Sequence, residues 1–171
     1  MSVINLIIGG LLLVALVTDL KERKIYNKHL MIGLLLGIVV LVSNSNYEGM
    51  ISGLKGMFIA FLLLSIPFLM NGIGGGDVKF LMVMGFFIGP WPIVNVIINT
   101  YLVGGIIALI ILLYKNKLFE SLKRMGHLIF ASLFHRKILE LDSCEENLTM
   151  PYMIPISIGS LLYIFRIMEF I

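Results

Sequence analysis

Residues 50–89 read MISGLKGMFIAFLLLSIPFLMNGIGGGDVKFLMVMGFFIG, which is two apolar blocks on either side of a short glycine run that ends in Asp77. Apolar blocks of this kind are typical of helices that cross a membrane. A second aspartate, Asp19, closes the first apolar block of the chain. A carboxylate at membrane level is costly, so each of the two is a candidate functional residue.

The composition excludes an ordinary soluble domain. Of 171 residues, 59% are hydrophobic and 13% are charged, and the mean hydropathy is +1.03. The first apolar block lacks a basic stretch before it and an Ala-x-Ala-like cleavage site, so we expect no removable signal peptide. The single Cys144 excludes an internal disulfide and a cysteine-based zinc cluster. The sequence therefore predicts a multi-pass protein of the membrane.

The predicted fold class is all-α, with six transmembrane helices. Alternating strand patterns of about ten residues are missing from the sequence, which leaves helices as the form that spans. The predicted spans are Ser2–Thr18, His29–Val42, Met50–Met70, Val78–Gly89, Pro92–Tyr114 and Pro151–Phe170.

Lysine and arginine predict the orientation of these spans. The segment after the first span is basic, and so is the segment that begins at Lys115, whereas the loop Ser43–Gly49 and the turn Gly89–Pro92 contain no Lys or Arg. Basic segments stay in the cytoplasm, so the N-terminus is predicted to lie outside. Two crossings then separate Asp19 from Asp77, which predicts that both carboxylates lie at the cytoplasmic side.

The segment 115–150 is the sizeable stretch outside the predicted spans. Its apolar residues recur at helical spacing among basic ones, which predicts an amphipathic helix on the cytoplasmic leaflet. We expect residues 1–171 to form a single membrane domain.

Two readings of each aspartate stay open from the residues alone. Asp77 follows Gly74, Gly75 and Gly76, and it either caps a helix after a flexible loop or forms part of a site that an extended peptide can approach. Asp19 either caps the next segment, pairs with Lys21 or Arg23 at the interface, or belongs to the same site. Two adjacent carboxylates do not both ionise easily, so one can take a proton from water while the other, protonated, polarises a carbonyl group. That chemistry hydrolyses an amide bond.

Other chemistries fit the sequence less well. The glycine run lacks the Gly-Lys-Ser/Thr ending of a phosphate-binding loop. His29, His127 and His135 are too scattered for a zinc motif. We therefore expect no metal, no cofactor and no nucleic acid partner.

The two aspartate segments resemble those of the type IV prepilin peptidases and the preflagellin peptidases, which are membrane aspartic proteases with a Gly-x-Gly-Asp motif. Gly74-Gly75-Gly76-Asp77 is similar to that motif, and Asp77-Val78-Lys79 to its continuation. The segment Asp19–Asn27 resembles the first-aspartate segment of the family, with Tyr26 in place of a proline. Pro151–Pro155 resembles the entry to the last helix.

The resemblance implies an aspartic endopeptidase of the cytoplasmic membrane that removes the short basic leader of prepilin-like or preflagellin-like precursors at the cytoplasmic face. Asp19 and Asp77 would be catalytic, Gly74 and Gly76 would shape the site, and Lys79 would either orient Asp77 or lie near lipid headgroups. The likeness is to the short form, without the paired-cysteine region, so we expect no methyltransferase activity. The alternative is a non-catalytic membrane scaffold or a proton-coupled transporter.

Overall fold

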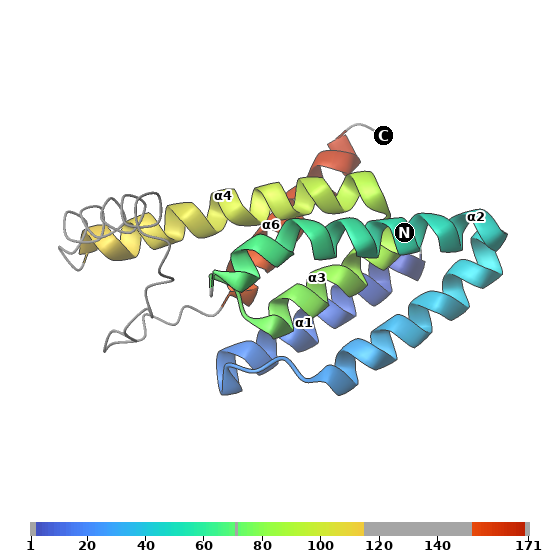
Figure 1. The fold of residues 1–171 in the computed structure, drawn as a ribbon, viewed down its shortest axis with the longest axis horizontal. Coiled ribbons are helices and arrows are strands. Elements are labelled where there is room, and N and C mark those ends of the chain that lie inside the picture. Colours follow the sequence, from blue (N-terminus) through green and yellow to red (C-terminus); the bar gives the residue numbers. More distant parts are fainter. Residues whose placement is uncertain (1–2, 71, 115–151, 170–171) are drawn as a thin grey trace, which may run out of the picture. The chain divides into compact units, whose positions relative to one another are not determined.

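A computed structural model describes residues 3–70, 72–114 and 152–169, and every regular element in these ranges is a helix. The all-α prediction is therefore confirmed for the described residues (Figure 1). The helices are α1 (Val3–Glu22), α2 (Asn27–Leu69), α3 (Gly75–Ile88), α4 (Pro90–Tyr114) and α6 (Met153–Glu169).

The chain divides into two compact units. The first contains Met1–Gly104 together with Pro151–Ile171, and the second contains Gly105–Met150. Of the second unit the structure describes residues 105–114, the end of α4. The predicted amphipathic helix over 115–150, with Cys144, His127 and His135, lies outside the described residues. The expectation of a single domain stays a prediction.

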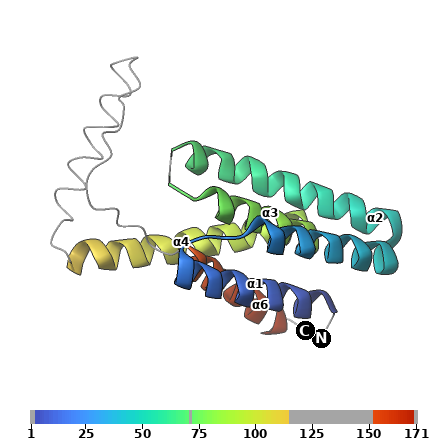
Figure 2. The same ribbon diagram turned by 90° about the horizontal axis from the view of Figure 1, so that it is seen from below.

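Helix α2 contains two of the predicted spans. Its backbone is helical through residues 43–49, where a loop was predicted, so that prediction is wrong. The ribbon nevertheless reverses direction within α2, and its two arms run back along each other (Figures 1 and 2).

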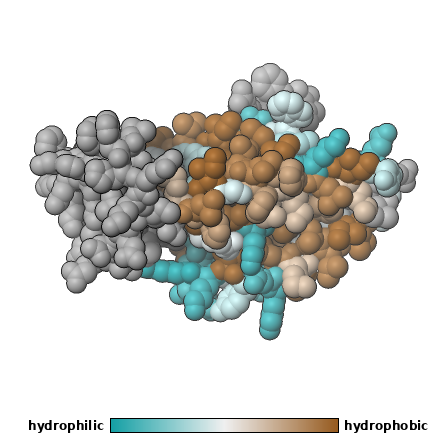
Figure 3. Space-filling view, in the orientation of Figure 1, coloured by the Kyte–Doolittle hydropathy of each residue, from teal (hydrophilic) through white to brown (hydrophobic). Residues whose placement is uncertain are grey.

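Two helical segments are long and apolar enough to cross a membrane by length and composition, namely Tyr47–Leu69 and Pro90–Ile111. Only 22% of each apolar window is buried within the protein, so most of its side chains face outward. Shorter apolar helical segments cover Asn27–Val40 and Met153–Tyr163. The described surface in Figure 3 is accordingly dominated by hydrophobic residues.

Helix α3 is the most enclosed element of the first unit. Nine of its 14 residues are buried, and it packs against both α1 and α2. Gly56 and Gly85 make the crossing of α2 and α3 very close, since a Cβ atom on Gly85 would lie 2.7 Å from the carbonyl oxygen of Gly56. Small residues at helix crossings allow this approach in membrane proteins. The start of α3, with Asp77, is held between its neighbours by this packing.

Helix α6 packs against α1 and against the first part of α4. A Cβ atom on Gly159 would lie 2.7 Å from the backbone nitrogen of Thr100, so the two backbones are nearly in contact. Met153 and Ile156, in the first turn of α6, are fully buried. The first turn of α6 is thereby brought against α1, close to Asp19.

Candidate active site

Asp77 lies in the first turn of α3, after the glycine run. Gly74 is the N-cap residue, with φ −70° and ψ 146°, so it does not need the left-handed conformation. What the glycines provide is space. A Cβ atom on Gly74 would lie 2.9 Å from Oδ2 of Asp77, and one on Gly76 would lie 3.0 Å from Cβ of Ile25. Ordinary side chains at 74 or 76 would therefore displace the carboxylate or the segment that covers it.

Asp77 is buried, and one of its two carboxyl oxygens lacks a hydrogen-bond partner within the described part of the chain. Its side chain is 8% exposed, and its Oδ1 atom has no hydrogen-bond partner among the described residues. Asp77 precedes the apolar stretch that was predicted to span the membrane. Burial, followed by the negative charge of Asp19, raises the pKa of Asp77 from 3.8 to about 7, although the backbone of Gly74 acts in the opposite direction. The carboxyl group is therefore poised to be protonated near neutral pH.

Asp19 lies in the last turn of α1 and is 7% exposed. Its Oδ2 atom accepts a hydrogen bond of 3.1 Å from the backbone N–H of Met153, the first residue of α6. Sequence reasoning missed this contact, because the donor is a main-chain group far along the chain. The Pro-x-x-x-Pro segment indicated where the last helix begins, but nothing in it indicated that the start of this helix contacts Asp19.

The two carboxylates line one pocket of about 440 Å³. Its walls come from the end of α1, the connector between α1 and α2, and the glycine run. The lining residues are Asp19, Arg23, Lys24, Ile25, Tyr26, Asn27, Gly74, Gly75, Gly76 and Asp77. The pocket therefore holds both aspartates together with Gly74 and Gly76, which were singled out from the sequence.

The connector between α1 and α2 turns sharply over the pocket. Arg23 adopts a left-handed conformation with φ 51° directly after α1, which is uncommon for a residue with a side chain. Tyr26 has φ −78°, a value that proline also adopts, so the turn does not depend on the proline found in the related segments. The Tyr26 hydroxyl donates a hydrogen bond to the carboxylate of Glu22.

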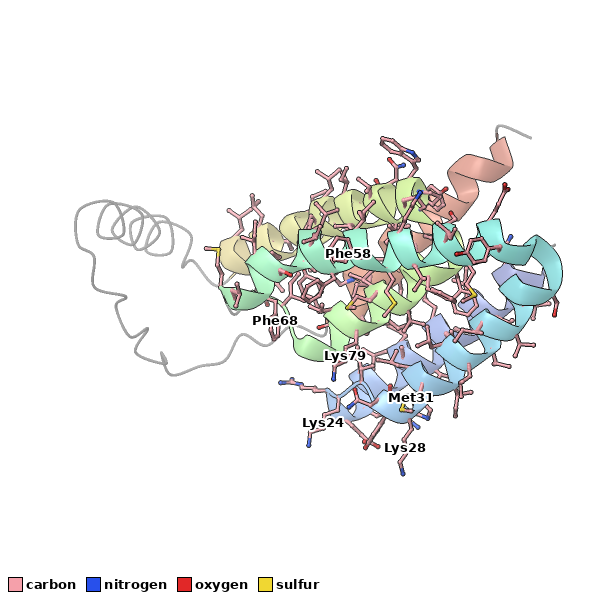
Figure 4. The ribbon with its side chains drawn as sticks, turned by 45° about the vertical axis from the view of Figure 1, so that its right-hand side comes forward. Lys24, Lys28, Met31, Phe58, Phe68 and Lys79 are labelled. Carbon is pink, nitrogen blue, oxygen red and sulfur yellow. The ribbon has the colours of Figure 1, made fainter. Side chains whose placement is uncertain are left out.

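Lys79 is exposed and joins α3 to the start of α2. Its Nζ atom donates a hydrogen bond of 3.1 Å to Oδ1 of Asn27 at the start of α2. Figure 4 shows Lys24, Lys28 and Lys79 projecting on the same side of the first unit. The contact with Asn27 places Lys79 beside the pocket rather than in its lining.

Within the ranges that the structure describes, no group of three or more His, Cys, Asp or Glu side chains is arranged to hold a metal ion. The arrangement instead offers two carboxyl groups in different surroundings, one with a hydrogen-bond donor and one with an unsatisfied oxygen.

Fold and pocket together define a class: an all-helical protein with apolar, outward-facing helices and two buried carboxylates in one pocket. The sequence profile of the type IV leader peptidase family matches residues 6–109, a range that includes both aspartates, and the chain belongs to that family. The family is membrane-bound.

One curated relative is the preflagellin peptidase of Methanococcus voltae. It is 38% identical to this chain over 81 residues, which is 45% of this chain and 34% of that protein. The chain thus matches about a third of the length of this relative. No solved structure matches the chain.

Proposed function

We propose that the protein is an aspartic endopeptidase that removes the short basic leader of prepilin-like or preflagellin-like precursors. The observation that carries this proposal is that Asp19 and Asp77, both buried, line the same pocket. Membership of the type IV leader peptidase family supports the same reaction class.

The pocket supports hydrolysis by a shared-proton pair. One carboxylate takes a proton from water while the water oxygen attacks the scissile carbonyl carbon, and the protonated partner donates its proton to the carbonyl oxygen. The raised pKa of Asp77 supplies the protonated partner near neutral pH. No covalent enzyme intermediate is needed.

The proposed membrane arrangement has six spans with the N-terminus outside and the pocket at the cytoplasmic face of the cell membrane. Basic residues of the connector next to the pocket support this orientation. Helix α3, with 14 residues, is about 21 Å long, which is less than the roughly 30 Å of the hydrocarbon core. A short helix of this kind would keep Asp77 at the cytoplasmic end of the span, where a substrate helix that emerges from the membrane can reach it.

The rival function is a scaffold or a proton-coupled transporter, in which the aspartates would bind protons without cleaving a peptide. The experiment that separates the two is coexpression with candidate precursors that carry a short basic leader before an apolar helix. Removal of the leader is read as a mobility shift on a gel.

We expect Asp19→Asn and Asp77→Asn each to abolish processing, because the pair fails when either member is unable to exchange a proton. Membrane insertion, measured by fractionation, should stay at the wild-type level. The matched control is Glu48→Gln, the same change from carboxylate to amide at an exposed position on α2. Processing at the wild-type rate by either aspartate variant would overturn the proposed function.

A further inference from the structure

We propose that the first turn of α6 is a positioning element for the reaction: the backbone N–H of Met153 holds the carboxyl group of Asp19 in place, so that Asp19 acts as the general base and Asp77 as the general acid. The inference rests on the proposed function and deepens it, since it names the group that orients Asp19 for its role as the base.

The geometry of the two carboxylates is unequal. Oδ2 of Asp19 accepts a 3.1 Å hydrogen bond from the Met153 N–H, and Met153 is fully buried, so water does not compete with that donor. Met153 is also the first residue of α6, where the helix macrodipole favours a negative charge. The backbone of Gly74 also hydrogen-bonds to the carboxyl group of Asp77, but its Oδ1 atom has no partner among the described residues.

The other titratable groups near Asp19 come from three elements. The connector contributes Arg23, Lys24 and Tyr26, which line the same pocket, and α3 contributes Asp77. Tyr152, just before α6, is half-buried. The N–H of Met153 differs from all of these because it does not titrate and is held in place by the helix.

The proton transfers then have a fixed direction. As the water oxygen bonds to the carbonyl carbon, Asp19 takes a water proton and Asp77 gives its proton to the carbonyl oxygen. When the C–N bond breaks, the proton on Asp19 passes to the leaving nitrogen, and Asp77 regains a proton from a hydroxyl group of the intermediate. One water is consumed, and both aspartates return to their starting state.

The test uses Met153→Pro in the full chain. Proline is favoured at the first position of a helix, so the change removes the N–H while it retains a residue that can begin α6. The matched control is Met153→Ala, which also loses the buried side chain but keeps the donor. Both variants are purified in detergent with the wild type, and the pH–rate profile is measured with a precursor that the wild type cleaves.

We expect Met153→Pro to lower kcat/KM near pH 6 about tenfold relative to Met153→Ala, because hydrogen bonds to carboxylates are stronger than those between neutral groups. The acidic limb of its profile should also shift to higher pH relative to that of Met153→Ala, which a merely structural defect would not produce. Equal profiles for the two variants would overturn the inference while the proposed function stands.

Folding is monitored by gel filtration and thermal unfolding. If Met153→Pro does not fold, the same comparison is made with the amide between Tyr152 and Met153 replaced by an ester, through incorporation of the α-hydroxy acid. The ester deletes the N–H of Met153 and otherwise only weakens the Tyr152 carbonyl that accepts from Ile156. A wild-type profile for the ester variant would overturn the inference. A wild type that cleaves no precursor would overturn the proposed function and this inference with it.

Discussion

At the scale of single residues, the decisive feature is the burial of Asp77 with one oxygen unsatisfied. A buried carboxyl group is more easily accommodated when neutral, and this preference is what makes it useful as an acid near pH 7. The same preference has a consequence for stability that is independent of any substrate.

Asp77 should make the fold less stable as the pH rises. Its pKa is raised from 3.8 to about 7, so the stabilisation from the protonated carboxyl is complete below about pH 4 and is lost as the pH rises through about 7. This pKa shift lowers the free energy of unfolding at high pH, relative to low pH, by on the order of 4 kcal/mol. Asp77→Asn should therefore unfold at a higher temperature than the wild type at pH 8, with a smaller advantage at pH 5.

The measurement is a thermal unfolding series in detergent from pH 5 to pH 8. Glu48→Gln serves as the control, because it makes the same chemical change at an exposed position and should follow the wild-type pH dependence. An Asp77→Asn protein whose advantage is equal at both pH values would contradict the assignment of a raised pKa.

A second prediction concerns the two adjacent glycines at positions 74 and 75. A Cβ atom on Gly74 would lie 2.9 Å from the movable carboxylate of Asp77, whereas one on Gly75 would meet the ring of Phe68 at an ordinary 3.4 Å. Gly74→Ala should therefore displace Asp77 and lower kcat/KM at least tenfold, since small misplacements of a reacting group have large effects. Gly75→Ala should retain most activity.

The unfolding temperatures of the two alanine variants separate an effect on activity from an effect on stability. Both should remain within a few degrees of the wild type, because the carboxylate of Asp77 is the flexible end of a side chain. Equal loss of activity in both variants would show that the glycine run acts through flexibility rather than through space beside Asp77.

At the scale of helices, the position of the site depends on the close crossing of α2 and α3. A Cβ atom on Gly56 would overlap the carbonyl oxygen of Gly85, and backbone atoms have no alternative rotamer. An added side chain is therefore tolerated less well at this crossing than at Gly74, where the side chain of Asp77 can move.

Gly56→Ala should separate α2 from α3 and destabilise the protein by about 1–3 kcal/mol or more, as overpacking does in well-packed cores. Gly9→Ala, on α1, is the control, because no atom lies within 4 Å of a Cβ atom there and alanine favours helix. Thermal unfolding in detergent measures both. A Gly56→Ala protein as stable as Gly9→Ala would contradict the close crossing.

At the scale of the whole molecule, the prediction concerns the membrane topology of the chain. Reporter fusions after Lys28, Met70 and Asp142 should report the cytoplasm, and fusions after Asn46 and at Trp91 should report the outside. The physical reason is the retention of basic segments in the cytoplasm. Opposite locations for the fusions after Lys28 and Met70 would contradict both the predicted topology and a pocket shared by the two aspartates.

Much of the candidate site was predictable because it contains aspartates, which are uncommon in such an apolar sequence. Asp19 and Asp77 were recognisable as charged residues at the edges of apolar blocks, and Gly74 and Gly76 as neighbours of one of them. The helical turn over 43–49 was not predicted, because polar residues between two apolar blocks look the same in a loop and in a helix. The role of Lys79 was left open, and its partner Asn27 emerged only from the packing of α3 against the connector.

The sequence by itself determined the helical class, the apolar character and the family, because these depend on composition and on short motifs that are local in the chain. Only the tertiary structure decided how the two carboxylates differ. Met153 donates to Asp19 because α6 packs against α1, and Asp77 is left with an unsatisfied oxygen because α3 is enclosed. Contacts between main-chain groups and distant side chains depend on how helices pack, and no local pattern of residues encodes them.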